Sequence, residues 1–167
     1  MIVLLAGVSG CGKSTVGGLL AGLLDCPFVD GDALHPAANI AKMRAGVPLT
    51  DEDRWPWLAA VAAVMDDDIA AGRSAVIACS ALKRSYRDLL LTGRPAARLV
   101  FLDVPRDLLA ARLTARHGHF FRADLLDSQL AALEKPEPAQ RILVVSAVGP
   151  PEQVAQQIAG LLGRPAG

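Results

Sequence analysis

The sequence predicts an α/β fold: a five-stranded parallel sheet with helices on both faces. Short, continuously apolar runs alternate with helical segments along the 167 residues, as in parallel sheets built from right-handed crossovers. Such runs are expected of strands buried on both faces. A glycine-rich loop follows the first run, where an open parallel sheet binds its ligands. We expect residues 1–167 to form one domain.

The first strand is expected at residues 2–6, which are apolar throughout. After the glycine loop, a first helix is predicted by apolar residues at helical spacing: Val16, Leu19, Leu20, Leu23 and Leu24. A second short strand is expected at 26–30. It leads into Gly31 and Asp32.

Two helices are expected next. Pro36 suits the first position of a helix that continues to about residue 45 and ends at Gly46. Thr50 and Asp53 form a plausible N-terminal cap for the following helix. Pro56 is early enough in that helix to be tolerated, and the helix should end at residues 71–72.

The second half of the chain continues the alternation. The expected strands cover residues 74–79, 99–102 and 142–145. Helical patterns follow Pro105 and cover residues 125–133 and 150–162. These elements complete five strands and the helices that connect them.

Residues 7–14, Gly-Val-Ser-Gly-Cys-Gly-Lys-Ser, match the pattern G-x-x-x-x-G-K-[ST] without a mismatch. Glycines let successive backbone N–H groups face an anion, and the following helix adds its positive end. Lys13 would reach the β- and γ-phosphates, and the Ser14 hydroxyl would bind Mg²⁺. The candidate nucleotide-binding residues are Gly7, Ser9, Gly10, Cys11, Gly12, Lys13, Ser14 and Thr15.

Two carboxylates on either side of Gly31 lie at the carboxyl end of the second strand, at the ligand-binding edge of the predicted sheet. Asp30 is the candidate metal residue beside Ser14, and Asp32 is the candidate base for an acceptor hydroxyl. An aspartate pair that only caps a turn is the structural alternative. Its place beside a phosphate loop favours phosphoryl transfer, which needs a cradle, a cation and a positioned acceptor.

Basic residues occur in two further places. Arg112 and Arg116 share one helix face ahead of a polar segment. Together with the phosphate loop, they predict a mobile lid, at about 117–135, that closes over ATP. Three cations after the third strand would suit an anionic substrate or belong to an ordinary surface helix: Lys83, Arg84 and Arg87. His35 is either a substrate contact or a turn residue.

Composition excludes several function classes. Seventeen basic and seventeen acidic residues give no global field for nucleic acid or an anionic membrane. The longest apolar run, residues 58–65, is too short to span a bilayer. Three cysteines without metal-like spacing favour reduced thiols and a cytoplasmic protein.

Five stretches together resemble gluconokinase, a P-loop kinase of the shikimate-kinase and adenylate-kinase-like group. They are GVSGCGKST (7–15), FVDGDALHPAANIAKMRAGVPLTDEDRWPWL (28–58), CSALKRSYRDLL (79–90), RLTARHGHFF (112–121) and LLDSQLAALEKP (125–136). The resemblance implies a three-layer P-loop NTPase fold and Mg²⁺-dependent transfer of the ATP γ-phosphate to the 6-hydroxyl of D-gluconate. It also implies a homodimer.

The resemblance assigns roles to individual residues. Lys13, Asp32 and Arg116 would be catalytic. Arg112 would lie against the adenine. The chain departs from the family at Lys135, where an acid is common, and in lacking an acid after the third strand.

Two other functions remain open. A kinase of the same architecture could act on shikimate or a nucleoside monophosphate. A nucleotide-dependent switch would lack a small acceptor and would only hydrolyse nucleotide slowly. ADP formation across a panel of acceptors separates these alternatives.

Overall fold

The computed structural model describes residues 1–117, 123–140 and 142–163. Its centre is one parallel sheet of five strands in the order β2-β3-β1-β4-β5. The strands are β1 (Ile2–Ala6), β2 (Phe28–Asp30), β3 (Ala75–Ala78), β4 (Ala97–Asp103) and β5 (Leu143–Ser146). The predicted fold class is confirmed. β4 extends two residues earlier and one later than the expected 99–102.

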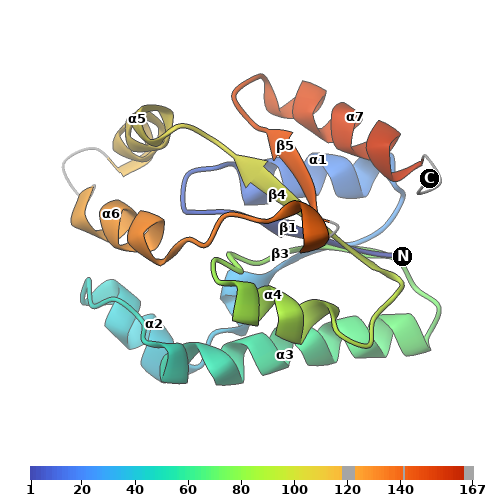
Figure 1. Cartoon of the computed structure of the whole chain (residues 1–167), viewed down its shortest axis with the longest axis horizontal. Coiled ribbons are helices and arrows are strands. Elements are labelled where there is room, and N and C mark those ends of the chain that lie inside the picture. Colours follow the sequence, from blue (N-terminus) through green and yellow to red (C-terminus); the bar gives the residue numbers. More distant parts are fainter. Residues whose placement is uncertain (118–122, 141, 164–167) are drawn as a thin grey trace.

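Helices cover both faces of the sheet (Figure 1). They are α1 (Lys13–Leu23), α2 (Ala37–Arg44), α3 (Asp51–Ala70), α4 (Arg84–Leu91), α5 (Arg106–His117), α6 (Ala123–Ala132) and α7 (Pro151–Leu162). The described residues also include two short 3₁₀ helices, η1 (Gly31–Leu34) and η3 (Pro138–Gln140). Among the described helices, none is long and apolar enough to cross a membrane.

The central strand β1 is buried on both faces of the sheet, which explains its unbroken apolar sequence. All five of its residues are buried. Val3 and Leu5 pack into a core shared with α1, α5, α6 and α7, whereas Ile2 and Leu4 pack into a second core with α3 and α4. Successive side chains of a strand point to opposite faces, so an unbroken apolar run fills both cores.

The local signals around α2 and α3 agree closely with the structure. Thr50 and Asp53 form a reciprocal capping box, with an aspartate where glutamate or glutamine is usual. α2 ends before Gly46, whose φ is 71°. Pro36 is the N-cap rather than the first helical residue, so that prediction was wrong by one position.

The predicted lid begins at the end of α5. Residues 118–122 of that segment lie outside the described residues, and the lid remains a prediction. Its second part is α6, which packs the buried Leu126 into the core beside α5. In Figure 1, α6 and α2 lie on the same side of the molecule, one above the other.

Candidate active site

The phosphate loop has the backbone that its glycines predict. Gly7, Gly10 and Gly12 have φ values of 141°, 83° and 102°, which other residues rarely adopt. A Cβ at Gly7 would lie 2.7 Å from Cys11 Sγ. Cys11 itself is fully buried. Its side chain therefore fills the space beneath the loop.

Lys13 ends this loop, and its side chain reaches back over it. Its ammonium donates hydrogen bonds to the carbonyl oxygens of Gly7 (2.9 Å) and Val8 (3.2 Å). α1 begins at the same residue, so the positive end of the helix and the ammonium face one region. Strand, loop and helix form the predicted anion-binding unit.

The two aspartates at the end of β2 take different positions: Asp30 is its last residue and Asp32 follows it. Asp30 accepts hydrogen bonds from the Ser14 hydroxyl (3.2 Å) and from the backbone N–H of Asp32 (3.1 Å). Its carboxylate thus lies beside the phosphate loop. Gly31 makes this turn possible, since a Cβ there would lie 2.2 Å from the carbonyl oxygen of Ala78. Asp32 projects into the adjoining cavity.

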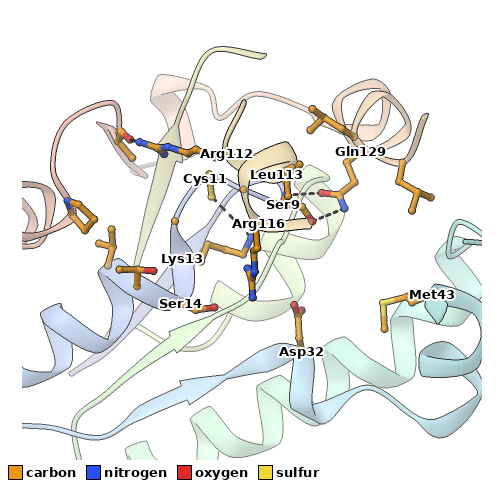
Figure 2. Close-up of a pocket in the computed structure, with 18 of the residues that line it drawn as sticks. Ser9, Cys11, Lys13, Ser14, Asp32, Met43, Arg112, Leu113, Arg116 and Gln129 are labelled. Carbon is orange, nitrogen blue, oxygen red and sulfur yellow. Dashed lines mark hydrogen bonds between the residues drawn. The ribbon is translucent and has the colours of Figure 1, made fainter. Parts of the chain in front are cut away.

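That cavity has a volume of about 900 Å³ and is bounded by the phosphate loop, α5, α6, the end of α2 and the β5–α7 loop. Figure 2 shows Arg116 reaching from α5 toward the space near Ser14, with Asp32 pointing in from the opposite wall. Phosphate-binding groups, a cation and a carboxylate therefore face one space. This arrangement suits transfer of a phosphoryl group to an acceptor that Asp32 could deprotonate.

Arg112 lies at another part of the same cavity. Its Nη2 donates to the carbonyl oxygen of Ala147 (2.8 Å). Nearby cavity residues Pro151 and Val154 are apolar. The flat face of an aromatic base would pack against these residues better than a phosphate would. That Arg112 lies on the adenine side stays a prediction.

His35 lies beneath the Asp32 turn and is 8% exposed. Its ring stacks on Trp57, with ring centroids 4.2 Å apart, and its Nδ1 is 3.2 Å from Asn39 Nδ2. Burial lowers the pKa of His35, while the nearby Asp32 raises it and Arg54 lowers it further. Of the two readings left open by the sequence, the turn residue fits this position better.

The three cations after β3 separate in the structure. Lys83 forms an ion pair with Asp51 (2.8 Å), and this hydrogen bond raises the pKa of Lys83. Arg84 is exposed, and its Nη1 lies 3.4 Å from a carboxylate oxygen of Glu137. Arg87 is buried. None of the three lines the cavity described here.

The position of Arg87 favours a structural role over the predicted substrate contact. Arg87 as a whole residue is only 1% exposed. Its guanidinium donates hydrogen bonds to the backbone carbonyls of Ala81, Leu82 and Glu134. Burial lowers the pKa of Arg87, an effect that Glu134 opposes. The side chain joins the start of α4 to the segment after α6, and it has no open face for a substrate carboxylate.

Sequence reasoning missed two residues of this region. Gln129 of α6 contacts the phosphate loop, and Arg54 of α3 donates to the Tyr86 hydroxyl at 3.3 Å. Arg54 also acts electrostatically on His35, as Asp32 does, so both charges lie near that ring. Both missed residues fall within the resembling stretches quoted above, but no local spacing distinguishes them from surface residues.

Comparison with known proteins adds to this geometry. The family described as Shikimate kinase matches residues 9–160. A gluconokinase of Gluconobacter oxydans is 47% identical over 91% of this chain and 85% of its own length. The thermoresistant gluconokinase of Escherichia coli is 43% identical over 92% and 88%. A crystal structure of a gluconokinase from Sinorhizobium meliloti superposes with a TM-score of 0.83, at 43% identity, over 96% and 94% of the two chains.

Proposed function

The chain belongs to the gluconokinases within the shikimate kinase family, and we propose that it transfers the γ-phosphoryl group of ATP to the 6-hydroxyl of D-gluconate. The products are 6-phospho-D-gluconate and ADP. The observation that carries this proposal is that Lys13, Arg116 and Asp32 all line one cavity.

The phosphate loop would hold the nucleotide. Its backbone N–H groups and the start of α1 bind the phosphates, and the Lys13 ammonium balances charge on the transferring group. Arg116, on α5, would balance the same negative charge on the phosphoryl group. These groups favour the transition state because they are aimed at the place where negative charge develops.

Asp32 would take the proton of the acceptor hydroxyl. The bond from the 6-oxygen to the γ-phosphorus forms while the bond from that phosphorus to the ADP oxygen breaks, and the proton passes to the Asp32 carboxylate. Asp32 is free for this role because Asp30, rather than Asp32, holds the Ser14 hydroxyl.

A magnesium ion fits the donor set beside the loop. The Ser14 hydroxyl and the Asp30 carboxylate supply hard oxygen ligands from two neighbouring elements. Within the described part of the chain, no three His, Cys, Asp or Glu side chains gather as a metal site, which suits an ion held mainly by phosphates and water. Such an ion would supply positive charge at the phosphate oxygens.

The gluconate carboxylate needs a cation that is not already neutralised. Lys83 is paired with Asp51, Arg84 lies beside Glu137, and Arg87 is buried on carbonyls. Arg54 also lies outside the cavity lining, but among the described residues its guanidinium hydrogen-bonds only to the neutral Tyr86 hydroxyl, while Asp51 acts on it electrostatically. We therefore place the carboxylate near Arg54, with the 6-hydroxyl toward Asp32.

An acceptor panel tests the function. ADP release should be stimulated by gluconate and not by shikimate, AMP or CMP. Equal release with and without gluconate would refute the kinase function and would instead fit a nucleotide switch.

Replacing Asp32 by asparagine tests the base. The change preserves size but removes the proton acceptor, so kcat should fall about 10²- to 10⁴-fold, with ATP binding nearly unchanged. Turnover at the wild-type rate would show that Asp32 is not the base and that it only caps the turn or lies near the metal.

The homodimer and the cytoplasmic location remain proposals. The first is implied by the family resemblance and is tested by sedimentation of the purified chain. The second is favoured by Cys11, Cys26 and Cys79, all three of which are free thiols.

A further inference from the structure

Two hydrogen bonds join the phosphate loop to α6, 120 residues later in the chain. The backbone N–H of Ser9 donates to Gln129 Oε1, and Gln129 Nε2 donates to Ser9 Oγ; both distances are 2.8 Å. Figure 2 shows this pair at the rim of the cavity, and both residues line it. The reaction scheme above does not use either bond.

Their directions follow from the chemistry of the groups. A backbone N–H can only donate, so the amide oxygen of Gln129 must face it. The amide nitrogen, which can only donate, therefore faces the Ser9 hydroxyl oxygen. That hydroxyl accepts one bond and keeps its own proton for another acceptor. Among the residues that the structure describes, none receives a hydrogen bond from the Ser9 hydroxyl.

Gln129 lies on a helix that packs against the core. Leu126, three residues earlier on α6, is 2% exposed and belongs to the core that also holds the phosphate-loop residues Val8 and Cys11. The amide is thus presented by a packed helix. Side chains on packed elements hold a geometry more accurately than side chains on loops.

We propose that Gln129 is a positioning residue that directs the Ser9 hydroxyl proton toward the γ-phosphoryl group of the bound nucleotide. The identity of that group rests on the proposed function. Phosphoryl oxygens are acceptors only, and a donor fixed before the reaction costs no reorganisation as charge develops. Gln129 acts through Ser9 and does not itself touch the reacting atoms.

The test compares nucleotides with and without a γ-phosphate. Calorimetry measures the affinity of each variant for ADP and for a non-hydrolysable ATP analogue. Gln129→Ala should lower the preference for the analogue over ADP about fivefold, the net worth of one hydrogen bond. Gln129→Glu should lower it further, because a carboxylate accepts the Ser9 proton and turns the hydroxyl away from the phosphate. Gln156→Ala, the same change at an exposed position of α7, should leave the preference unchanged.

A double-mutant cycle decides whether Gln129 acts through Ser9. Ser9→Ala alone should lower the preference, and adding Gln129→Ala to it should have no further effect. Equal weakening of both nucleotides would show that Gln129 only supports the loop, and additive effects would show that it acts independently of Ser9. Either result overturns the proposal. Because these affinities are measured without gluconate, a failed acceptor panel would refute the proposed function separately.

Discussion

Replacing Arg87 by alanine distinguishes substrate binding from structural support for the basic residues after β3. The guanidinium Nη1 donates to the carbonyl oxygens of Ala81 (3.3 Å), Leu82 (2.9 Å) and Glu134 (2.9 Å). Its Nη2 donates to Gln140 Oε1 at 3.0 Å. The side chain therefore joins two chain segments that lie about 50 residues apart in the sequence.

The expected loss of stability follows from the groups left behind. The carbonyl of Leu82 also accepts from the N–H of Glu134, and Gln140 Oε1 also accepts from Glu137. Within the described residues, the carbonyls of Ala81 and Glu134 accept no second hydrogen bond. The carbonyl of Ala81 is buried and would be orphaned at a cost of about 1–3 kcal/mol, whereas the part-buried carbonyl of Glu134 can bind water instead. The lost packing adds to this cost, and the loss of Arg87 Nε, which is buried without a partner, offsets part of it. We expect Arg87→Ala to lower the free energy of unfolding by about 2–4 kcal/mol.

Urea unfolding followed by circular dichroism measures this loss. Arg84→Ala is the matched control, because its side chain is 56% exposed and its ion pairs should contribute no more than about 1 kcal/mol. Arg87→Lys retains a charge and supplies a second variant if the alanine protein does not fold. In the folded variants, KM for gluconate should remain within about twofold of wild type. A stable Arg87→Ala protein with a strongly raised KM would refute the structural role and restore the substrate contact.

Three further predictions concern the site. Lys13→Ala should abolish most of kcat, measured by coupled ADP release, because it deletes the positive charge aimed at the transferring group. A near-normal kcat would show that this loop does not bind the catalytic nucleotide. Arg54→Met should raise KM for gluconate at least about tenfold, the lower range for a hydrogen bond to a charged group, with KM for ATP little changed; an unchanged gluconate KM would place the carboxylate elsewhere. Because the pKa of His35 lies below its ordinary 6.5, the unfolded chain binds the proton first, so the free energy of unfolding should decrease as the pH falls below about 6.5. His35→Gln should lose that part of the pH dependence in urea titrations, and an identical pH profile would show that His35 does not titrate differently on unfolding.

The sequence predicted best what depends on neighbouring residues. The strand–loop–helix unit at the N-terminus needs only an apolar run, correctly spaced glycines and a helical period, all within 24 residues. The Thr50–Asp53 capping box spans four residues and was recognised for the same reason. In both cases the interacting groups are close in the chain, so spacing alone determines their contact.

Residues whose partners are distant were assigned poorly. Three cations that follow a buried strand look alike in the sequence: Lys83, Arg84 and Arg87. Their roles differ because Arg87 turns toward carbonyls near residue 134, whereas Lys83 meets Asp51, which is 32 residues earlier. No pattern within α4 specifies those partners. Gln129 was missed for the same reason, since its partner lies 120 residues away.

These distant contacts hold the two halves of the site in place. On the acceptor side, Trp57 of α3 donates from its indole Nε1 to the carbonyl of Gly31 at 2.7 Å, in the turn that separates Asp30 from Asp32. On the nucleotide side, Gln129 of α6 holds Ser9 in the phosphate loop. Each catalytic loop is therefore anchored by a helix outside the strand–loop–helix unit to which it belongs. The phosphate-loop motif is enough to bind an anion, but the alignment of acceptor and phosphoryl donor depends on α3 and α6, and substitutions there should change kcat without altering any motif residue.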